Sequence, residues 1–422
     1  MLTNHNDNSC SEYDLVIIGG GCAGLSLAAA MCRLAAKPTH VPSTLIIEPR
    51  LRYTDDRSWC FWEAGVQPGQ AVHENTKLVA KSWHAWEFSS GSVSHLQSSV
   101  SGWKYHYIPA IRFYDQVEKQ IVRNKNITLL MGSRVTDVNL GDDHIEVFFE
   151  SGPSDSLYET QKVVGRQIVD TRVPESVDLG SALLKQVFFG FEVKLNSPHQ
   201  FDDVARVMED MRVDEEGFMF DYVLPLNRNS LLVEFTRFAE KPLSPDSLRS
   251  DALKSLRRVC GDSEFQIVRE EAGVIPMGLN NPVASTDPRW IHIGLGAGAA
   301  RPSTGYAFKR IQRWAEQCAE SILSEGKVRR FQPDSASLMW MDKVFLRTIS
   351  GNPAIAPQLF MSLARDVPPD SLLRFLTDRP STRDLLAVTL ALPKLPLIRC
   401  ALAELFAGMR TASRTQSWHE VR

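Results

Sequence analysis

A glycine-rich turn near the start of the chain constrains the fold more than any other feature. The run Tyr13–Ile18 is apolar at its end, too short for a helix, and leads into Gly19, Gly21 and Gly24; an alanine-rich helical pattern follows as far as Leu34. This order is typical of the first βα unit of a dinucleotide-binding fold. We therefore expect a buried parallel strand, a tight turn and a helix.

The spacing of these glycines suits a pyrophosphate. Gly19 permits the turn, Gly21 lets the backbone approach the phosphates, and Gly24 lets the helix pack close to the strand. The phosphates would lie against the free N–H groups at the start of the helix. A second apolar run, residues 45–47, ends in Glu48, whose carboxylate would accept the ribose hydroxyls of an adenosine. The motif predicts a bound dinucleotide but does not distinguish FAD from NAD.

Composition excludes several classes of function. The 47 basic and 50 acidic residues nearly balance, so no surface for nucleic acid is expected. The seven cysteines form no CxxC pair and no cluster at metal-ligand spacing, which favours reduced thiols and no metal site. Residues 1–12 are polar, unlike a secretory signal, and are expected to be a disordered lead-in. No apolar run reaches the roughly 18 residues that would span a bilayer.

The order of predicted elements indicates a discontinuous α/β protein. Residues 13–185 and 278–334 are predicted to form a Rossmann-type nucleotide domain. An antiparallel sheet over 186–277 is inserted between them and is expected to hold the substrate. Residues 335–422 are rich in Leu, Ala and Arg and are predicted to be helical.

A second glycine turn returns to the nucleotide domain late in the chain. It contains Gly294 and Gly298, and is followed by Thr304, Gly305 and a predicted helix over 309–323. Backbone N–H groups there would suit the far end of FAD, which NAD alone would not require. The alternative is an ordinary glycine-rich loop.

Two carboxyl groups interrupt apolar strands. Glu192 and Glu234 each lie in a predicted strand of the inserted sheet, where an ionised, unpaired carboxylate is strongly unfavourable. Each is therefore paired, protonated or functional. For Glu234 the structural alternative is an ion pair with Arg237 or Arg228.

The stretch 50–63 has an unusual composition for a surface loop. It holds three arginines, two aspartates and four aromatic residues, among them Trp59, Phe61 and Trp62. Because large aromatic side chains are usually buried, this loop either folds into a core or lines a site for a flat or apolar ligand.

Together these motifs resemble a known family, the bacterial lycopene β-cyclases of the flavin-dependent carotenoid cyclase group, from Tyr13 to about Phe375. Besides the first glycine turn and Glu48, the markers are Arg57–Trp62, Val169–Arg172, Gln186–Gly190, Val207–Met211, Phe220–Leu226, Leu232–Thr236, Gly273–Met277, Arg301–Tyr306 and Met341–Arg347. The glycine turn alone is generic, whereas the whole set in this order is specific.

The resemblance implies a catalytic acid. In that family an acid on the strand with the pattern Leu/Phe-Ile/Leu-Glu-Glu/Asp-Thr does the chemistry, and Glu234 falls on its first acidic position. It would protonate the terminal alkene of a linear polyene, since burial in an apolar strand keeps a carboxyl group neutral. Phe235 occupies the second acidic position and, as the next residue on the strand, is expected to point away. Glu192 is the second candidate for the acid.

The resemblance also implies cofactors and a pocket. FAD would be active in its reduced form, with NAD(P)H as the reductant. Arg112 resembles an FAD-contacting arginine of the wider hydroxylase-like superfamily, and Asp170, which ends a buried strand, is expected beside the same cofactor. Aromatic rings would stabilise the cation formed during cyclisation; the candidates are Trp59, Phe61, Trp62, Phe220 and Tyr222.

The implied reaction is a redox-neutral cyclisation of the linear end group or groups of lycopene to β-ionone rings. Neurosporene, γ-carotene or another linear polyene would need the same acid. The rival interpretations are an aromatic hydroxylase or polyprenyl reductase on a similar scaffold, and a catalytically silent flavin- or carotenoid-binding protein.

Because the polyene resides in lipid, we expect a cytoplasmic protein, peripheral on the inner face of the cell membrane. The apolar stretch 385–409 is interrupted by prolines and basic residues, and either lies in the membrane interface or forms core helices. The sequence leaves the oligomeric state open.

Overall fold

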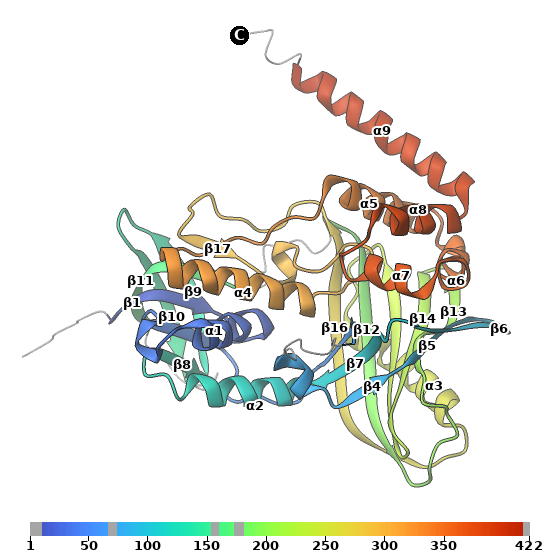
Figure 1. Cartoon of the computed structure of the whole chain (residues 1–422), viewed down its shortest axis with the longest axis horizontal. Helices are drawn as coiled ribbons and strands as arrows, with labels where there is room; N and C mark the ends of the chain where they lie inside the picture. Colours follow the sequence, from blue (N-terminus) through green and yellow to red (C-terminus); the bar gives the residue numbers. More distant parts are fainter. Residues whose placement is uncertain (1–10, 66–73, 153–159, 173–180, 417–422) are drawn as a thin grey trace, which may run out of the picture.

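The structure is a computed structural model, which describes residues 11–65, 74–152, 160–172 and 181–416, the last range with side chains as far as residue 405. Most of the expected disordered lead-in lies outside the described residues, and the first strand begins at Ser11. The fold is α/β, as predicted. It combines a nucleotide domain, a second sheet and a helical C-terminal region (Figure 1).

The first sheet is built around the predicted glycine-turn strand. It runs in the order β8 (Ile127–Met131), β2 (Thr44–Glu48), β1 (Ser11–Ile18), β11 (Thr160–Asp170), β10 (Ile145–Ser151) and β9 (Ser133–Leu140), with β17 (Trp290–His292) also paired to β11. The pairings among β8, β2, β1, β11 and β17 are parallel, and those of β9 and β10 are antiparallel. Strand β17 arrives from late in the chain, so the domain is discontinuous.

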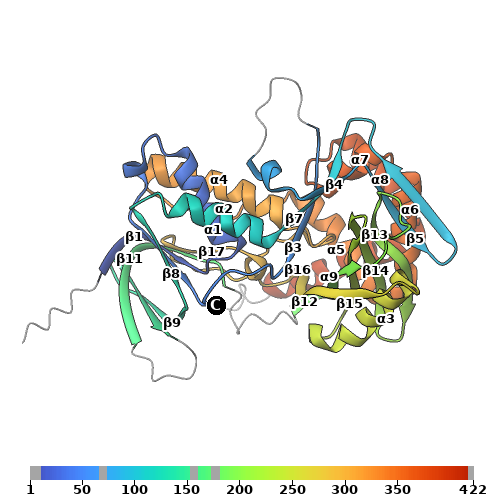
Figure 2. The same cartoon turned by 90° about the horizontal axis from the view of Figure 1, so that it is seen from below.

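Three helices cover one face of this sheet. Helices α1 (Cys22–Leu34), α2 (Ala110–Ile121) and α4 (Phe308–Glu325) lie side by side there (Figure 2). Leu15 and Ile17 of β1 pack in the core that these helices share, whereas Val16 and Ile18 belong to a second apolar cluster. This alternation follows from the two-residue period of a strand buried on both faces.

The second sheet is almost wholly antiparallel. Its order is β16 (Phe265–Leu279), β12 (Ala182–Leu195), β15 (Ser230–Ala239), β14 (Gly217–Asn227), β13 (Ala205–Asp214), β5 (Ala85–Ser90) and β6 (Val93–Ser98). Helix α3 (Arg249–Cys260) packs on one face. The hairpin β5–β6 comes from within the range 13–185 but belongs to this sheet, through parallel pairing of β5 with β13. The inserted sheet therefore includes strands from outside 186–277.

A small sheet lies between the two larger ones. It consists of β3 (Ser58–Glu63), β7 (Lys104–Pro109) and β4 (Lys81–Trp83). Its strand β3 corrects the expectation of a loop over 50–63, because residues 58–63 pair antiparallel with β7. Local sequence could not show this partner, which lies more than forty positions away along the chain.

The C-terminal region is helical, as predicted. It contains α5 (Ala336–Gly351), α6 (Ala356–Asp366), α7 (Pro369–Leu376), α8 (Thr382–Ala391) and α9 (Lys394–Gln416), and α9 projects away from the body (Figure 1). No single helix within the described residues is long and apolar enough to cross a membrane. Helix α8 and the first half of α9 meet that criterion only as a pair, with a bend of 113° between them.

Candidate active site

The first glycine turn leaves open space at the N-terminus of α1. A Cβ on Gly19 (φ +98°) would overlap the Thr171 hydroxyl, and a Cβ on Gly24 would overlap the Gly19 carbonyl. A Cβ on Gly21, in contrast, would meet nothing within 4 Å, and no side chain caps the first turn of α1. The N–H groups of that turn therefore face free space, which fits a pyrophosphate.

Glu48 and Asp170 end the two strands that flank β1. Glu48 is 3% exposed and accepts hydrogen bonds from the Gly20 amide (2.7 Å) and from Arg50 Nε (2.7 Å). Asp170 is 1% exposed, and its carboxylate lies 2.7 Å from Arg172 Nη2. Both carboxylates therefore lie at the C-terminal edge of the parallel strands, where such sheets bind their ligands.

The second glycine turn borders the same region. Gly294 and Gly298 both have positive φ, at 108° and 79°, and Thr304 and Gly305 line a cavity. Helix α4 then begins at Phe308 without a side-chain cap. This part of the chain thus presents a second helix start toward the first glycine turn.

A buried ion pair fixes this turn to the helical region. The Arg301 side chain is fully buried, and its Nε lies 3.1 Å from the Asp342 carboxylate of α5. The same carboxylate accepts a hydrogen bond from Ser303 Oγ (2.8 Å). The loop that carries Thr304 is therefore held from both the nucleotide domain and the C-terminal helices.

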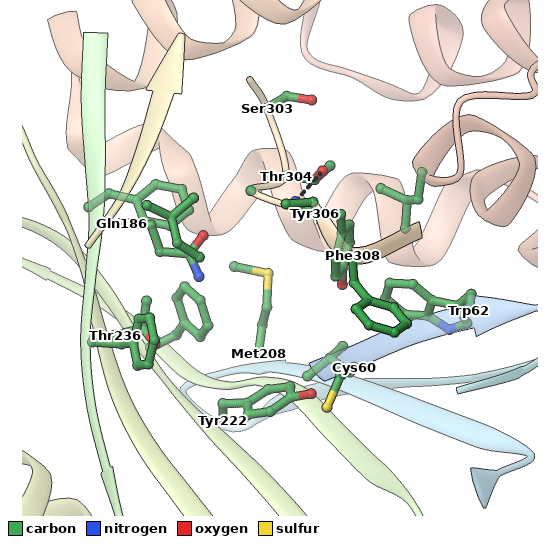
Figure 3. Close-up of a pocket in the computed structure, with 18 of the residues that line it drawn as sticks. Cys60, Trp62, Gln186, Met208, Tyr222, Thr236, Ser303, Thr304, Tyr306 and Phe308 are labelled. Carbon is green, nitrogen blue, oxygen red and sulfur yellow. Dashed lines mark hydrogen bonds between the residues drawn. The ribbon is translucent and has the colours of Figure 1, made fainter. Parts of the chain in front are cut away.

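A cavity of about 400 Å³ joins these elements. It begins beside Cys22 and Leu295, follows the face of the second sheet, and ends under α5 to α8. Figure 3 shows Thr236 and Tyr222 on the side of the sheet, with Thr304 on the side of the second glycine turn. Most of the lining is apolar or aromatic, so the few polar groups that enter it would orient a ligand.

Glu234 enters the cavity from β15. The residue opposite it on β12 is Gly190, where a Cβ would collide with the Glu234 side chain. On β14 the residue opposite is Tyr222. Burial is the largest cause that raises the pKa of Glu234 well above its ordinary value of 4.5. The missing side chain at Gly190 therefore makes room for a buried carboxyl group whose pKa is raised.

Glu271 approaches Glu234 from the other side of Gly190. It is the residue opposite Gly190 on β16, so two carboxyl groups flank one glycine. Glu271 is 4% exposed and accepts hydrogen bonds from Ser58 Oγ (2.9 Å) and Arg269 Nη1 (2.8 Å). Its charge and its hydrogen bond to Glu234 further raise the pKa of Glu234. Sequence reasoning missed Glu271, because only the strand register brings these two residues together.

Aromatic rings form much of the lining near Glu234. Four of the five predicted rings lie there, those of Trp59, Trp62, Phe220 and Tyr222. The Tyr222 and Tyr105 hydroxyl oxygens are 2.6 Å apart and share a hydrogen bond. Further rings that the sequence patterns did not indicate are those of Phe188, Tyr105, Tyr306 and Phe308.

The prediction that Phe61 lines the pocket is corrected. Phe61 is 3% exposed and belongs to the core of the nucleotide domain, where its ring stacks on that of Phe308 with 5.4 Å between centroids. Side chains alternate along β3, so Cys60 and Trp62 face the cavity and Phe61 faces away. Trp59 lies on the same face as Phe61 and also stacks on Phe308, but it still borders the cavity.

One known protein family matches most of this chain. The family described as lycopene cyclase protein matches residues 14–402. This chain belongs to the lycopene cyclase family. Two similar proteins bear the name lycopene beta-cyclase. That of Pseudescherichia vulneris is 24% identical and covers 91% of this chain and 95% of its own length. That of Pantoea ananas is 24% identical and covers 92% and 96%.

Solved structures share the fold of this chain. A geranylgeranyl bacteriochlorophyll reductase-like protein from Thermoplasma acidophilum has a TM-score of 0.56 at 12% identity, over 92% of this chain and 98% of that chain. A flavin-dependent brominase has a TM-score of 0.51 at 15% identity, over 94% and 100%. At such identities the likeness shows the fold alone, a fold that flavin-dependent enzymes use.

Phe235 points away from the cavity, as expected. It is 2% exposed, and its ring centre lies 5.4 Å from the Arg212 guanidinium and 5.8 Å from that of Arg237. Arg237 is paired with Asp214 at 2.6 Å. The alternative of a structural Glu234–Arg237 ion pair therefore does not hold, since the two side chains leave opposite faces of β15.

Two other predicted residues lie outside the cavity lining. Glu192 is 3.1 Å from Arg269, so this second candidate acid is paired. Arg112 has an exposed side chain that donates a hydrogen bond to the Val79 carbonyl (3.2 Å). Its contact with a cofactor stays a prediction.

Proposed function

We propose that this protein converts the linear end group or groups of lycopene into β-ionone rings without net oxidation or reduction. The observation that carries the proposal is Glu234, an acid with a raised pKa that faces an aromatic cavity. Protonating an alkene carbon requires an acid that is neutral at physiological pH and shielded from water. The names of the two similar proteins support lycopene as the substrate.

The residues of the cavity suit each step of this reaction. Glu234 donates its proton to the terminal alkene, and an internal double bond closes the six-membered ring on the resulting cation. The ring then loses a proton, which returns to the Glu234 carboxylate, so that no proton is gained or lost overall. The rings of Phe220 and Tyr222 line the same cavity and would each stabilise the cation by about 0.5–2 kcal/mol. The apolar walls would exclude the water that otherwise traps such a cation.

FAD is the proposed cofactor. The support comes from the chain's own residues: open space at Gly21, the uncapped start of α1, the buried Glu48 beside it, and Thr304 and Gly305 on the cavity wall. When bound in its reduced form, FAD would supply negative charge opposite the cation, and NAD(P)H would be the reductant. The resemblance of the whole chain to flavin-dependent cyclases motivates this choice over NAD alone.

The proposed location is the cytoplasmic side of the cell membrane, with α8 and α9 toward lipid. On α8, Val388 lines the cavity while Leu386 and Leu390 are 58% and 63% exposed. Large apolar side chains on the start of α9 are also 48–70% exposed, namely Leu395, Ile398, Leu402 and Leu405. Exposed leucines on a helix that also borders the cavity would bring the lipid-dissolved polyene close to Glu234.

Expression in a lycopene-accumulating bacterium, followed by chromatography of the pigments, tests the reaction. Wild type is expected to form cyclic product, and Glu234→Gln to lose at least about 100-fold of the activity, the contribution of a general acid. Glu209→Gln is the matched control, because this carboxylate lies on the same sheet but outside the cavity lining. Unchanged lycopene with wild type would reject lycopene as substrate. NAD(P)H consumption in proportion to product would favour a redox enzyme instead.

A further inference from the structure

Glu271 has no part in the proposed reaction, although it lines the same cavity as Glu234. We propose that Glu271 is the positioning residue for the acid: fixed by hydrogen bonds from Arg269 and Ser58, it orients Glu234 into the cavity and keeps it protonated. This inference rests on the proposed function and names the group that prepares its acid.

The strand register carries the first part of the argument. Gly190 of β12 stands between Glu234 of β15 and Glu271 of β16, and is paired with both. Any side chain at position 190 would collide with the Glu234 side chain. With glycine there, the two carboxyl groups meet over β12 and share a hydrogen bond. Such a bond requires one proton between them, because two ionised carboxylates would repel each other.

The hydrogen-bond partners of Glu271 indicate which of the two carboxyl groups holds the shared proton. Its two oxygens accept hydrogen bonds from Ser58 on β3 and Arg269 on β16. Because both partners donate to Glu271, the proton of the bond between the two carboxyl groups is supplied by Glu234. Arg269 donates no hydrogen bond to Glu234 in the structure, where its partners are Glu271, Glu192, Ser58 and Tyr107. The proton therefore resides on Glu234.

The surrounding charges act in both directions: the charge of Glu271 raises the pKa of Glu234, and the charge of Arg269 lowers it. Arg269 is closest to Glu271 (2.8 Å) but also lies 3.1 Å from Glu192 and 3.5 Å from Asp55. The guanidinium of Arg269 is shared among three carboxylates, and its effect on the pKa of Glu234 is smaller than the effects of burial and of Glu271. The other ionisable groups that face the pair are Cys60 on β3, Tyr107 on β7, Tyr222 on β14, and Arg57, which pairs with Asp56.

Glu271→Gln tests this role with two readouts. The amide keeps the size of the side chain but removes its charge. The alkaline limb of the pH–activity profile on lycopene is expected to move to lower pH by at least about one unit, the size of effect that a nearby like charge has on a pKa. In infrared difference spectra, the protonated-carboxyl band that is absent from Glu234→Gln is expected to vanish at correspondingly lower pH.

Two further variants separate positioning from mere support of the fold. Glu271→Asp keeps the charge and is expected to restore most of the wild-type profile. Glu192→Gln removes a different carboxylate from Arg269 without removing the partner of Glu234, so its profile is expected to shift less than that of Glu271→Gln. A Glu271→Gln variant with an unmoved infrared band would overturn the role of Glu271. If wild type converts no lycopene, the proposed reaction is overturned instead. The infrared band would then still test whether Glu271 keeps Glu234 protonated.

Discussion

At the scale of single residues, the site depends on Glu234, a carboxylic acid whose burial disfavours its ionised form. Burial and the neighbouring Glu271 raise the pKa of Glu234, so the folded protein holds this proton more tightly than the unfolded chain does. Stability from this group is therefore greatest below pH 4.5 and is lost progressively as the pH rises toward the folded-state pKa. The chain thus gives up stability at neutral pH to keep a buried carboxyl group in the cavity, as functional sites often do.

Glu234→Gln is expected to make the protein more stable than wild type at neutral and alkaline pH. The gain should grow by about 1.4 kcal/mol per pH unit between the unfolded-state and folded-state pKa values, since glutamine has no proton to lose. Urea unfolding at a series of pH values measures it. Parallel stability curves for the two proteins would show that Glu234 does not titrate with a raised pKa.

At the scale of elements, strand β12 shapes the site because its Gly190 has no side chain and leaves room for Glu234. It lies between β15 and β16 in the second sheet, and Gly190 is its residue at the meeting point of the two carboxyl groups. A glycine inside a strand usually weakens the strand and marks a close approach of other groups. Here the approaching groups are the side chains of Glu234 and Glu271.

Gly190→Ala is expected to reduce cyclic product at least about tenfold and to cost about 1–3 kcal/mol of stability, because its methyl group would displace Glu234. Flavin content should be unchanged, since Gly190 lies on the second sheet, away from the glycine turns. Product chromatography, thermal unfolding and flavin absorbance measure the three quantities. Gly351→Ala at the end of α5, where a Cβ meets nothing within 4 Å, is the control. Wild-type activity of Gly190→Ala would contradict this account.

At the scale of the whole molecule, three regions close one cavity. The nucleotide domain supplies the two glycine turns, the second sheet supplies Glu234, and helices α5 to α8 cover the far end. The buried Arg301–Asp342 ion pair ties the second glycine turn to α5. The exposed leucines of α8 and α9 lie on this helical cover, so substrate entry and membrane contact would occur at the same end of the molecule.

Leu390→Asp combined with Leu395→Asp is expected to lower binding to phospholipid vesicles by at least about tenfold, the value of burying one to two leucine side chains. Both side chains are more than 60% exposed, so the fold should be retained. Co-sedimentation with vesicles measures the effect. Leu140→Asp on β9, an exposed leucine of the nucleotide domain, is the control. Equal binding by the double variant would place the membrane contact elsewhere.

Local sequence patterns predicted the nucleotide half of the fold and indicated Glu234 as a candidate acid. A glycine turn between a short apolar run and a helix is a local signal, and so is a carboxyl group in an apolar strand, because neighbouring residues alternate between its two faces. The opposed directions of Glu234 and Phe235 followed from the same period. The ring lining was predicted for Trp59, Trp62, Phe220 and Tyr222, all of which line the cavity.

The pairing of the strands could be seen only in the tertiary structure. The tertiary structure places the hairpin β5–β6 in the second sheet and Phe61 in the core. Within the expected loop over 50–63, residues 58–63 form a strand. The tertiary structure also brings Glu271 to Glu234 across Gly190. Strand register depends on contacts between segments far apart in the chain, and a shift by one residue reverses the face of every side chain. The periodicity within one strand does not contain that information.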